Sequence, residues 1–429
     1  MNDREACPVA FPKKRLLVIL GSGSSMPCCM PSVANLDNKM KDWCREWKPP
    51  AEVVFRSACT RWEVFNDLWG MVESYYKKRE ALSLPLRVNF ENVLREMIAL
   101  AYRVTPVPFG NALRLAVENP RLSSRFFPWS APAQSDALHL HQITIKYQLA
   151  YLLENLATHM RERSMALNKD APNFLAYRSI LSRLRDEFEV GVYNLNYDNV
   201  AISAWPDAFT GFRHGQFDAR AVSVRKEWEF IYPLHGSVHY SLASEQRANI
   251  LWMDDLTRSD FTDSTSVSST AEEFKPLVPT TLIAGAFKLD QLLADPFQTF
   301  YASLVRHAHE ADALLVAGYG FGDVHVNRAL QNMFSHTPGS DSRLPPVVVI
   351  TKSDASTQQM GIRQNSDNWA QRLGETLRTS FDWNQPVPQK LIEKNAVELD
   401  LQKRVAIWHG GFVEAGAHLD AVVDWLYKS

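Results

Sequence analysis

Two short motifs put amide, carboxylate and imidazole side chains directly after apolar runs. Asn196 and Asp198 lie in Tyr193-Asn-Leu-Asn-Tyr-Asp198, and His235 lies in Pro233-Leu-His-Gly-Ser-Val-His239. Amides and carboxylates suit the recognition of sugar hydroxyls, and a histidine can accept a proton near neutral pH. Taken singly, each motif has a plainer interpretation. Asn and Asp commonly cap backbone N–H groups in turns, and a lone histidine is more often structural than catalytic.

Two glycine-rich turns also follow apolar runs, Gly21-Ser-Gly-Ser-Ser25 and Gly318-Tyr-Gly-Phe-Gly-Asp323. Glycines allow a tight bend and close approach of the backbone to a ligand, and a helix start after the first turn would direct N–H groups at phosphate. Position 26 is methionine, so the third glycine of the G-x-G-x-x-G pattern is absent. No acidic residue ends a second strand about twenty residues later, which argues against a dehydrogenase.

Six short apolar runs predict the strands that position these motifs. Each has the length of a strand in a parallel sheet that is buried on both faces. The runs are Arg15–Leu20, Glu189–Leu195, Glu229–Leu234, Ala313–Ala317, Val347–Thr351 and Val405–Trp408. Several end in Gly, Asn or His, at the edge where such a sheet binds its ligands.

The stretch between the first two runs predicts helices. Apolar residues recur there at three- and four-residue spacing, as in Phe90–Leu100 and Gln142–Arg163. We therefore expect an α/β fold with a parallel sheet and helices on both faces, in a single domain over 1–429. Its core strands are expected within 15–25 and 187–412, with a helical insertion at about 35–186. The tryptophans of that insertion are interpreted as packing the helices together, or alternatively as a partner-binding face; they are Trp43, Trp47, Trp62 and Trp69. Thr257–Glu273, rich in Ser, Thr and Asp, predicts an exposed loop.

The composition excludes several classes of protein. Hydrophobic residues make up 46% and charged residues 22% of the 429 positions, and the net charge of −2 gives no general attraction to nucleic acid or anionic membrane. The apolar run Leu16–Leu20 is too short for a membrane span or a signal peptide, so a cytoplasmic protein is expected. The five cysteines lie in the first sixty residues without a C-x-x-C pair, which supports neither a disulfide framework nor a zinc ribbon.

The order of the four motifs is more informative than any one of them. A glycine turn, N-x-D, L-H-G and G-Y-G-F-G-D, each after its own strand, resembles the sirtuin-like family with its Rossmann-like sheet, and in particular its bacterial NAD-degrading branch. Asn89-Phe90-Glu91 and Leu282–Lys288 also look like that branch. The resemblance spans roughly Arg15 to Phe412.

The sequence also departs from the protein-deacylating sirtuins. Those proteins carry four zinc-binding cysteines, whereas no cysteine follows Cys59 here. Their G-I-P-D-F-R stretch is replaced by Cys29-Met-Pro-Ser-Val-Ala34. Both differences count against an acyl-lysine substrate and leave the expected NAD site intact.

The resemblance implies a role for each site residue. Asn196 and His235 are expected to be catalytic at the nicotinamide ribose, Asn196 by orienting the ribose and a water, and His235 as the base. The residues expected to bind NAD are Gly21, Ser22, Gly23 and Ser24 at the diphosphate, Asp198 at a ribose, and Gly318, Gly320 and Asp323 toward the adenosine. NAD is the expected substrate, and no metal is expected.

Four other basic residues near these motifs have less defined roles. His239 and His409 are interpreted as structural, because no metal-ligand spacing links His239 to His235. His325 contacts either the ligand or its packing neighbours, and Lys288 is a candidate neighbour of the pocket.

The resemblance also implies a biological setting. The sequence resembles stand-alone effectors of anti-phage defence (abortive infection) that act with a HerA-like ATPase. A HerA-type partner and a homo-oligomer are therefore expected, and neither membrane binding nor direct nucleic-acid binding is expected. The expected activity is NAD+ hydrolysis to nicotinamide and ADP-ribose, activated within a complex with the HerA-type ATPase. The alternatives are an NAD-dependent deacylase or ADP-ribosyltransferase, and a non-catalytic sensor of NAD or ADP-ribose.

Overall fold

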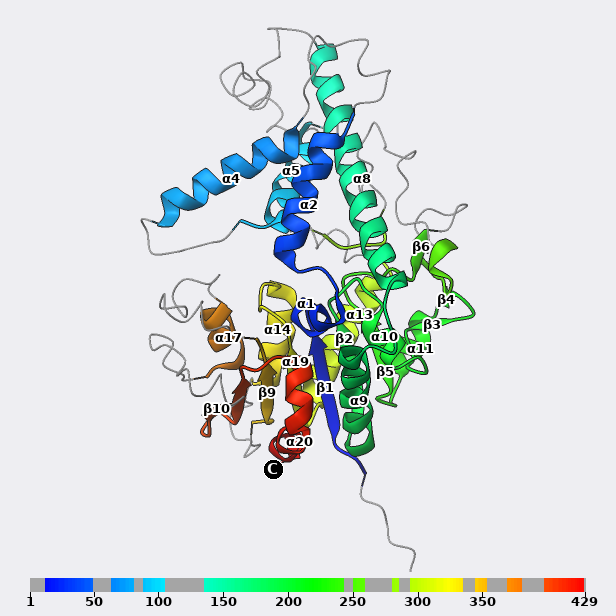
Figure 1. The fold of residues 1–429 in the computed structure, drawn as a ribbon, viewed down its shortest axis with the longest axis vertical. Coiled ribbons are helices and arrows are strands. Elements are labelled where there is room, and N and C mark those ends of the chain that lie inside the picture. Colours follow the sequence, from blue (N-terminus) through cyan, green and yellow to red (C-terminus); the bar gives the residue numbers. More distant parts are fainter. Residues whose placement is uncertain are drawn as a thin grey trace, which may run out of the picture.

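The structure is a computed structural model. It describes residues 12–48, 63–80, 88–104, 135–242, 250–258, 280–284, 294–334, 344–352, 369–379 and 397–427. The fold has a body built on a sheet, and a group of helices stands over one edge of that sheet (Figure 1).

The body contains a seven-stranded sheet of order β10-β11-β9-β8-β1-β2-β5. The strands are β1 (Arg15–Leu20), β2 (Glu189–Asn194), β5 (Phe230–Pro233), β8 (Ala313–Ala317), β9 (Val347–Ile350), β10 (Val397–Asp400) and β11 (Val405–Trp408). Neighbours pair in parallel except for β10, which is antiparallel to β11. The six predicted strands are confirmed to within one residue at each end. The short edge strand β10 was not predicted, because its alternating Val-Glu-Leu-Asp sequence has no continuous apolar run.

Both faces of the sheet are covered by helices, as predicted. Along β1, Leu16, Val18 and Leu20 belong to one core cluster, and Leu17 and Ile19 belong to another. All five side chains are fully buried. The first cluster is completed by helices α9 (Pro172–Glu187), α19 (Phe412–Ala415) and α20 (Leu419–Tyr427). The second is completed by α13 (Phe297–Glu310), α14 (Val324–Met333) and α17 (Trp369–Leu377).

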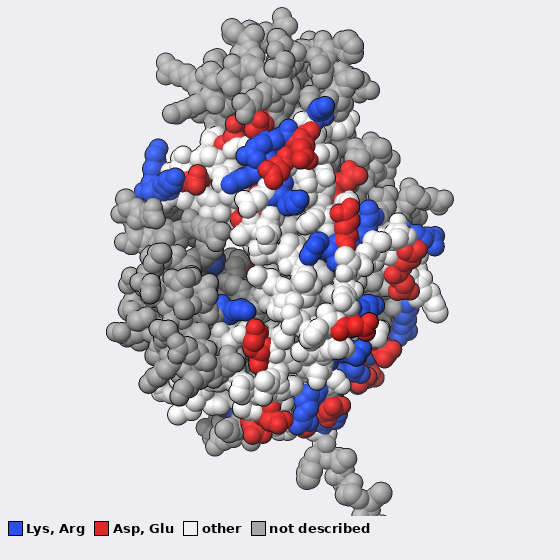
Figure 2. All heavy atoms as spheres, viewed as in Figure 1, with Lys and Arg blue, Asp and Glu red and all other residues white. Residues whose placement is uncertain are grey.

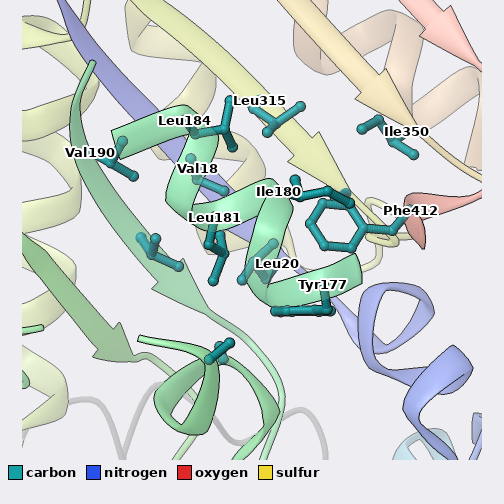
Figure 3. Close-up of a cluster of buried hydrophobic side chains, with 14 of the residues drawn as sticks. Val18, Leu20, Tyr177, Ile180, Leu181, Leu184, Val190, Leu315, Ile350 and Phe412 are labelled. Atoms are coloured by element: carbon teal, nitrogen blue, oxygen red, sulfur yellow. The ribbon is translucent and has the colours of Figure 1, made fainter. Parts of the chain in front are cut away.

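Helix α9 packs directly on the sheet. In Figure 3, Tyr177, Ile180 and Leu184 of this helix lie among side chains of β1 and β2, and the Tyr177 ring meets that of Phe412 with 4.9 Å between centroids. Burial of each large apolar side chain contributes about 1.5–3 kcal/mol. Thus α9, which falls within the stretch expected to be the insertion, belongs by its packing to the body.

The remaining helices of that stretch form a third core cluster. They are α2 (Val33–Glu46), α4 (Val64–Glu80), α5 (Phe90–Val104) and α8 (Ser135–Met165). Tyr197, Val238 and Leu282 of the body also belong to this cluster, and we propose on that basis that the four helices are an insertion within one domain. Trp69 is buried in the cluster and Trp43 packs against it, which confirms the helix-packing interpretation for these two residues. Trp47 is also buried. Trp62 lies outside the described residues.

A second, smaller sheet was not predicted. Its order is β3-β4-β7-β6, with β3 (Phe212–Arg213), β4 (Gln216–Phe217), β7 (Ile250–Trp252) and β6 (Tyr240–Leu242). Strands of two or three residues are too short to leave a periodic pattern in a sequence. Of the loop predicted over Thr257–Glu273, only Thr257 and Arg258 are described, at the end of the short helix η2 (Leu256–Arg258); the rest lies outside the described residues.

The described surface shows no large patch of one charge on the face in Figure 2, where Lys and Arg side chains are interspersed with Asp and Glu. Among the described residues, no helix combines the length and the apolar character needed to cross a membrane.

Candidate active site

Four neighbouring strands end together at one edge of the seven-stranded sheet. Leu20 of β1 is in register with Asn194 of β2 and Ala317 of β8, and Asn194 is in register with Pro233 of β5. The chain adds β2 and β5 on one side of β1, then β8, β9 and β11 on the other, so the strand order reverses at β1. Open α/β sheets bind ligands in the crevice at such a switch point. The four sequence motifs follow these four strands, and the fold therefore brings them together.

The two glycine-rich turns contact each other across this edge. The Gly21 N–H donates to Ala317 O at 2.9 Å, and the Gly23 N–H donates to Gly318 O at 3.0 Å. A Cβ atom on Gly318 would lie 2.2 Å from the backbone N of Ser24, and Gly318 has φ +63°. A side chain is therefore excluded at Gly318 by the fold itself, independently of any ligand.

A cavity of about 390 Å³ opens beside these turns. This volume lies within the range of small-molecule sites, roughly 300–1,000 Å³. Eight of the ten predicted site residues line the cavity: Gly21, Ser22, Asn196, Asp198, His235, Gly318, Gly320 and Asp323. The helices α2, α4, α5 and α8 contribute to its walls, so it lies between the sheet edge and the insertion.

Gly23 and Ser24 do not line the cavity, and their place at the diphosphate stays a prediction. Ser24 is fully buried and its Oγ donates to Gly21 O at 2.8 Å, which closes the turn. The turn is itself the short helix α1 (Ser22–Ser25), and the next long helix begins only at Val33. The helical run expected after Pro31 is α2, so its N-terminus does not directly follow the glycines.

The Asn196 side chain is held in place by its amide nitrogen. Nδ2 lies 3.1 Å from Gly21 O and 3.3 Å from Ser25 Oγ, and the side chain is almost completely buried. Within the described part of the chain, no hydrogen bond is donated to its Oδ1. The arrangement provides a fixed amide oxygen at the cavity that can accept a hydrogen bond from a ligand hydroxyl or a water.

Asp198 is engaged by the protein through both carboxylate oxygens. Ser25 Oγ donates to Oδ2 at 2.7 Å, and the Val200 N–H donates to Oδ1 at 3.0 Å, at the start of α10 (Val200–Ala204). Burial raises the pKa of Asp198, and these two hydrogen bonds partly oppose that effect. Because Ser25 contacts both Asn196 and Asp198, we propose that Asp198 positions Asn196 instead of binding a ribose directly.

His235 and Asp323 form a close pair in the cavity. His235 Nε2 lies 2.9 Å from Asp323 Oδ2, and the side chains are 8% and 4% exposed. The other oxygen of Asp323 accepts from the N–H groups of His325 and Val326 and caps α14. The cap fixes the carboxylate that faces the histidine.

His239, His325 and His409 do not line the cavity. The His239 ring stacks on Trp252 at 4.5 Å, its Nδ1 lies 2.8 Å from Met253 O, and burial lowers its pKa. His409 is buried, and His325 is half-buried. Lys288 lies outside the described residues.

Sequence reasoning missed several residues that line the cavity. Ser25 stands in the glycine turn but had no assigned role, and Tyr319 lies between two of the predicted glycines. Glu91 belongs to the Asn89-Phe90-Glu91 motif, and Arg372 of α17 lies in a segment without any motif. A Cβ atom on Gly322 would lie 4.0 Å from Arg372 Nη1, so the guanidinium borders the second glycine turn.

The assembled groups suit hydrolysis of a polar substrate. A fixed amide oxygen can orient a hydroxyl or a water, and an imidazole backed by a carboxylate can accept its proton. In the described part of the chain, no group of three or more His, Cys, Asp or Glu side chains has the arrangement of a metal site.

Comparison with solved structures gives weak similarities over much of the chain. A triple mutant of a Sir2 homologue in complex with 2′-O-acetyl-ADP-ribose is 10% identical with a TM-score of 0.35, covering 97% of this chain and 94% of that one. A Sir2 homologue mutant bound to ADP-ribose is 10% identical with a TM-score of 0.32, covering 86% and 96%. Sir2Tm with a propionylated peptide is 11% identical with a TM-score of 0.27, covering 85% and 93%. At such low identity and TM-score, we draw nothing about activity from these matches.

The sequence comparisons locate the relationship more narrowly. No curated protein matches this sequence. A family model described as a SIR2-like domain matches residues 190–372. This segment begins in β2, includes Asn196, His235 and Asp323, and ends at Arg372 of the cavity wall. Residues 190–372 of the chain are thus similar to a SIR2-like domain.

Proposed function

We propose that this protein is an NAD+ glycohydrolase, which binds NAD+ at the switch point of the sheet and releases nicotinamide and ADP-ribose. The observation that carries the proposal is the meeting of a fixed Asn196 amide and the 2.9 Å His235–Asp323 pair in one cavity. The match of this segment to a SIR2-like domain supports NAD+ as the substrate.

The proposed reaction breaks the bond between ribose C1′ and the nicotinamide nitrogen. Both bonding electrons go to the nitrogen, so the cationic pyridinium leaves as neutral nicotinamide and needs no proton from an acid. The ribose carbon becomes oxocarbenium-like, as in other glycoside cleavages. A water oxygen then bonds to C1′, and its proton goes to the base and onward to solvent.

In this mechanism Asn196 and His235 divide the work. Asn196 Oδ1 accepts a hydrogen bond from the ribose or from the attacking water, which holds the reactants in line. His235 takes the proton from that water or from a ribose hydroxyl. Asp323 stabilises the imidazolium that forms, so we now propose it as a positioning residue for His235 in place of its expected role toward the adenosine.

The rest of the cavity is proposed to hold the dinucleotide. Gly21, Ser22, Gly318 and Gly320 line it, and the glycines permit close approach of a diphosphate to the backbone. Arg372 provides a guanidinium beside the second glycine turn, and this group pairs well with phosphate oxygens.

Product analysis tests this proposal. Purified protein is incubated with NAD+, with and without the ATPase partner, and nicotinamide and ADP-ribose are quantified by chromatography. Equal amounts of both products support hydrolysis. Acyl-ADP-ribose formed from an acylated peptide would indicate a deacylase, ADP-ribosylated protein would indicate a transferase, and NAD+ binding without turnover would indicate a sensor; each of these results would contradict the proposal.

We further propose that NAD+ depletion serves anti-phage defence by abortive infection, with a HerA-type ring ATPase as partner and a homo-oligomeric assembly. The support is the family resemblance of the four motifs. The helices α2, α4, α5 and α8 are the proposed docking element, because they both wall the cavity and form their own core cluster. Size-exclusion chromatography of the chain with and without the ATPase tests the assembly. A monomer that leaves the ATPase unbound would contradict it.

A further inference from the structure

The start of helix α5 brings a carboxylate to the cavity from outside the SIR2-like segment. Glu91 lines the cavity and lies in the first turn of α5. Two sets of hydrogen bonds fix this turn. The backbone N–H of Asn89 donates to Asn92 Oδ1 at 3.2 Å, and the backbone N–H of Asn92 donates to Asn89 Oδ1 at 3.0 Å. Asp37 Oδ1 accepts from the Phe90 N–H at 2.7 Å.

The fold thus holds Glu91 firmly while leaving its carboxylate available. Its neighbour Phe90 is 2% exposed and anchored in the core of the helical insertion, whereas Glu91 itself is half-buried. Within the described part of the chain, no hydrogen bond or ion pair engages the Glu91 carboxylate. A half-buried charge at a cavity wall without a protein partner is suited to a ligand of opposite charge.

Glu91 lines the same cavity as the His235–Asp323 pair. Burial of the phenol group is the main cause that raises the pKa values of Tyr197, Tyr301 and Tyr319. In each of the three, the negative charges of Glu91 and Asp323 add to that rise. Both carboxylates therefore act on one group of tyrosine side chains, and both line the cavity that holds the residues assigned to the nicotinamide ribose.

We propose that Glu91 is a specificity residue that selects the positively charged, oxidised nicotinamide ring. The inference rests on the proposed function and adds a preference for NAD+ over NADH. The two dinucleotides have nearly the same size and the same diphosphate, but only the ring of NAD+ is cationic. Nicotinamide loses its charge when the bond breaks, so the same carboxylate holds the substrate and releases the product.

A binding experiment separates charge selection from general binding. Isothermal titration with NAD+ and with NADH is carried out on His235→Ala protein, which prevents turnover, with and without Glu91→Gln. We expect the preference for NAD+ to fall by about tenfold in Glu91→Gln, equal to about 1.4 kcal/mol, through weaker binding of NAD+ alone. Glu91→Asp keeps the charge and should keep the preference.

The matched control is Glu96→Gln. Glu96 is on the same helix, contacts Arg95 at 3.0 Å and does not line the cavity, so its substitution should leave both affinities unchanged. Equal weakening of NAD+ and NADH by Glu91→Gln, or no weakening, would overturn the role of Glu91 while leaving the proposed function standing. If neither dinucleotide binds to the parent protein, the proposed function itself is wrong and the role of Glu91 is lost with it.

Discussion

The Asp323→Asn substitution removes one negative charge from the cavity and leaves the shape of the side chain nearly unchanged. At the observed 2.9 Å, two unit charges interact by about 6 kcal/mol with an effective dielectric constant of about 20. If about half a unit charge has developed on His235 in the transition state, the substitution removes about 3 kcal/mol of transition-state stabilisation. We therefore expect kcat to fall by about 10²-fold, with little change in KM.

The assay is the initial rate of nicotinamide release, compared at equal folded concentration. An asparagine oxygen can still cap α14, so Tm should change by no more than a few degrees. The matched control is Asp218→Asn, because Asp218 caps α11 (Ala219–Val224) by accepting from the Ala221 N–H and does not line the cavity. A well-folded Asp323→Asn protein with kcat within threefold of the parent would refute the role of the pair.

Three further expectations concern the fold around the site. Gly318→Ala should destabilise the protein by about 3 kcal/mol or more in urea unfolding, because its Cβ would collide with backbone at 2.2 Å. A Cβ on Gly320 meets nothing within 4 Å, so Gly320→Ala should unfold like the parent. Equal stabilities of the two variants would contradict the contact between the glycine turns. Burial raises the pKa of Asp198, so the folded state keeps its proton to higher pH than the unfolded state, and stability is lost as pH rises above about 4. Asp198→Asn should flatten that part of the curve of unfolding free energy against pH. An unchanged curve would contradict this contribution of Asp198. Burial lowers the pKa of His307 to about 3, so stability is lost as pH falls below about 6.5. His307→Gln should therefore show a shallower acid-unfolding curve by circular dichroism. A curve as steep as that of the parent would exclude protonation of His307 as a cause of acid unfolding.

The parts of the fold that the sequence predicted are those with a strong local signal. β1 is a continuous apolar run because it is buried on both faces, and its neighbours share this property. Once the strands are known to be parallel, the motifs after them must meet at one edge. Asn196 and His235, which are far apart in the sequence, could therefore be predicted to lie at the same edge of the sheet.

The parts that were missed depend on tertiary contacts. Gly21 and Gly23 are the same residue type in one turn, and no local pattern shows which of the two lines the cavity. The His235–Asp323 contact joins two loops whose relative orientation no local pattern specifies. Glu91 comes from a helix whose position over the sheet edge depends on the packing of the whole insertion.

The central claim is that Asn196 and His235 cleave NAD+, and the most direct measurement compares two histidines four positions apart. Nicotinamide release is measured for the parent, His235→Ala and His239→Ala, each with and without the ATPase partner. His235 lines the cavity beside Asp323, whereas His239 stacks on Trp252 outside the cavity lining. We expect His235→Ala to lose about 10²–10⁴-fold in rate and His239→Ala to keep the rate of the parent per folded molecule. Full NAD+ cleavage by well-folded His235→Ala protein would contradict the account.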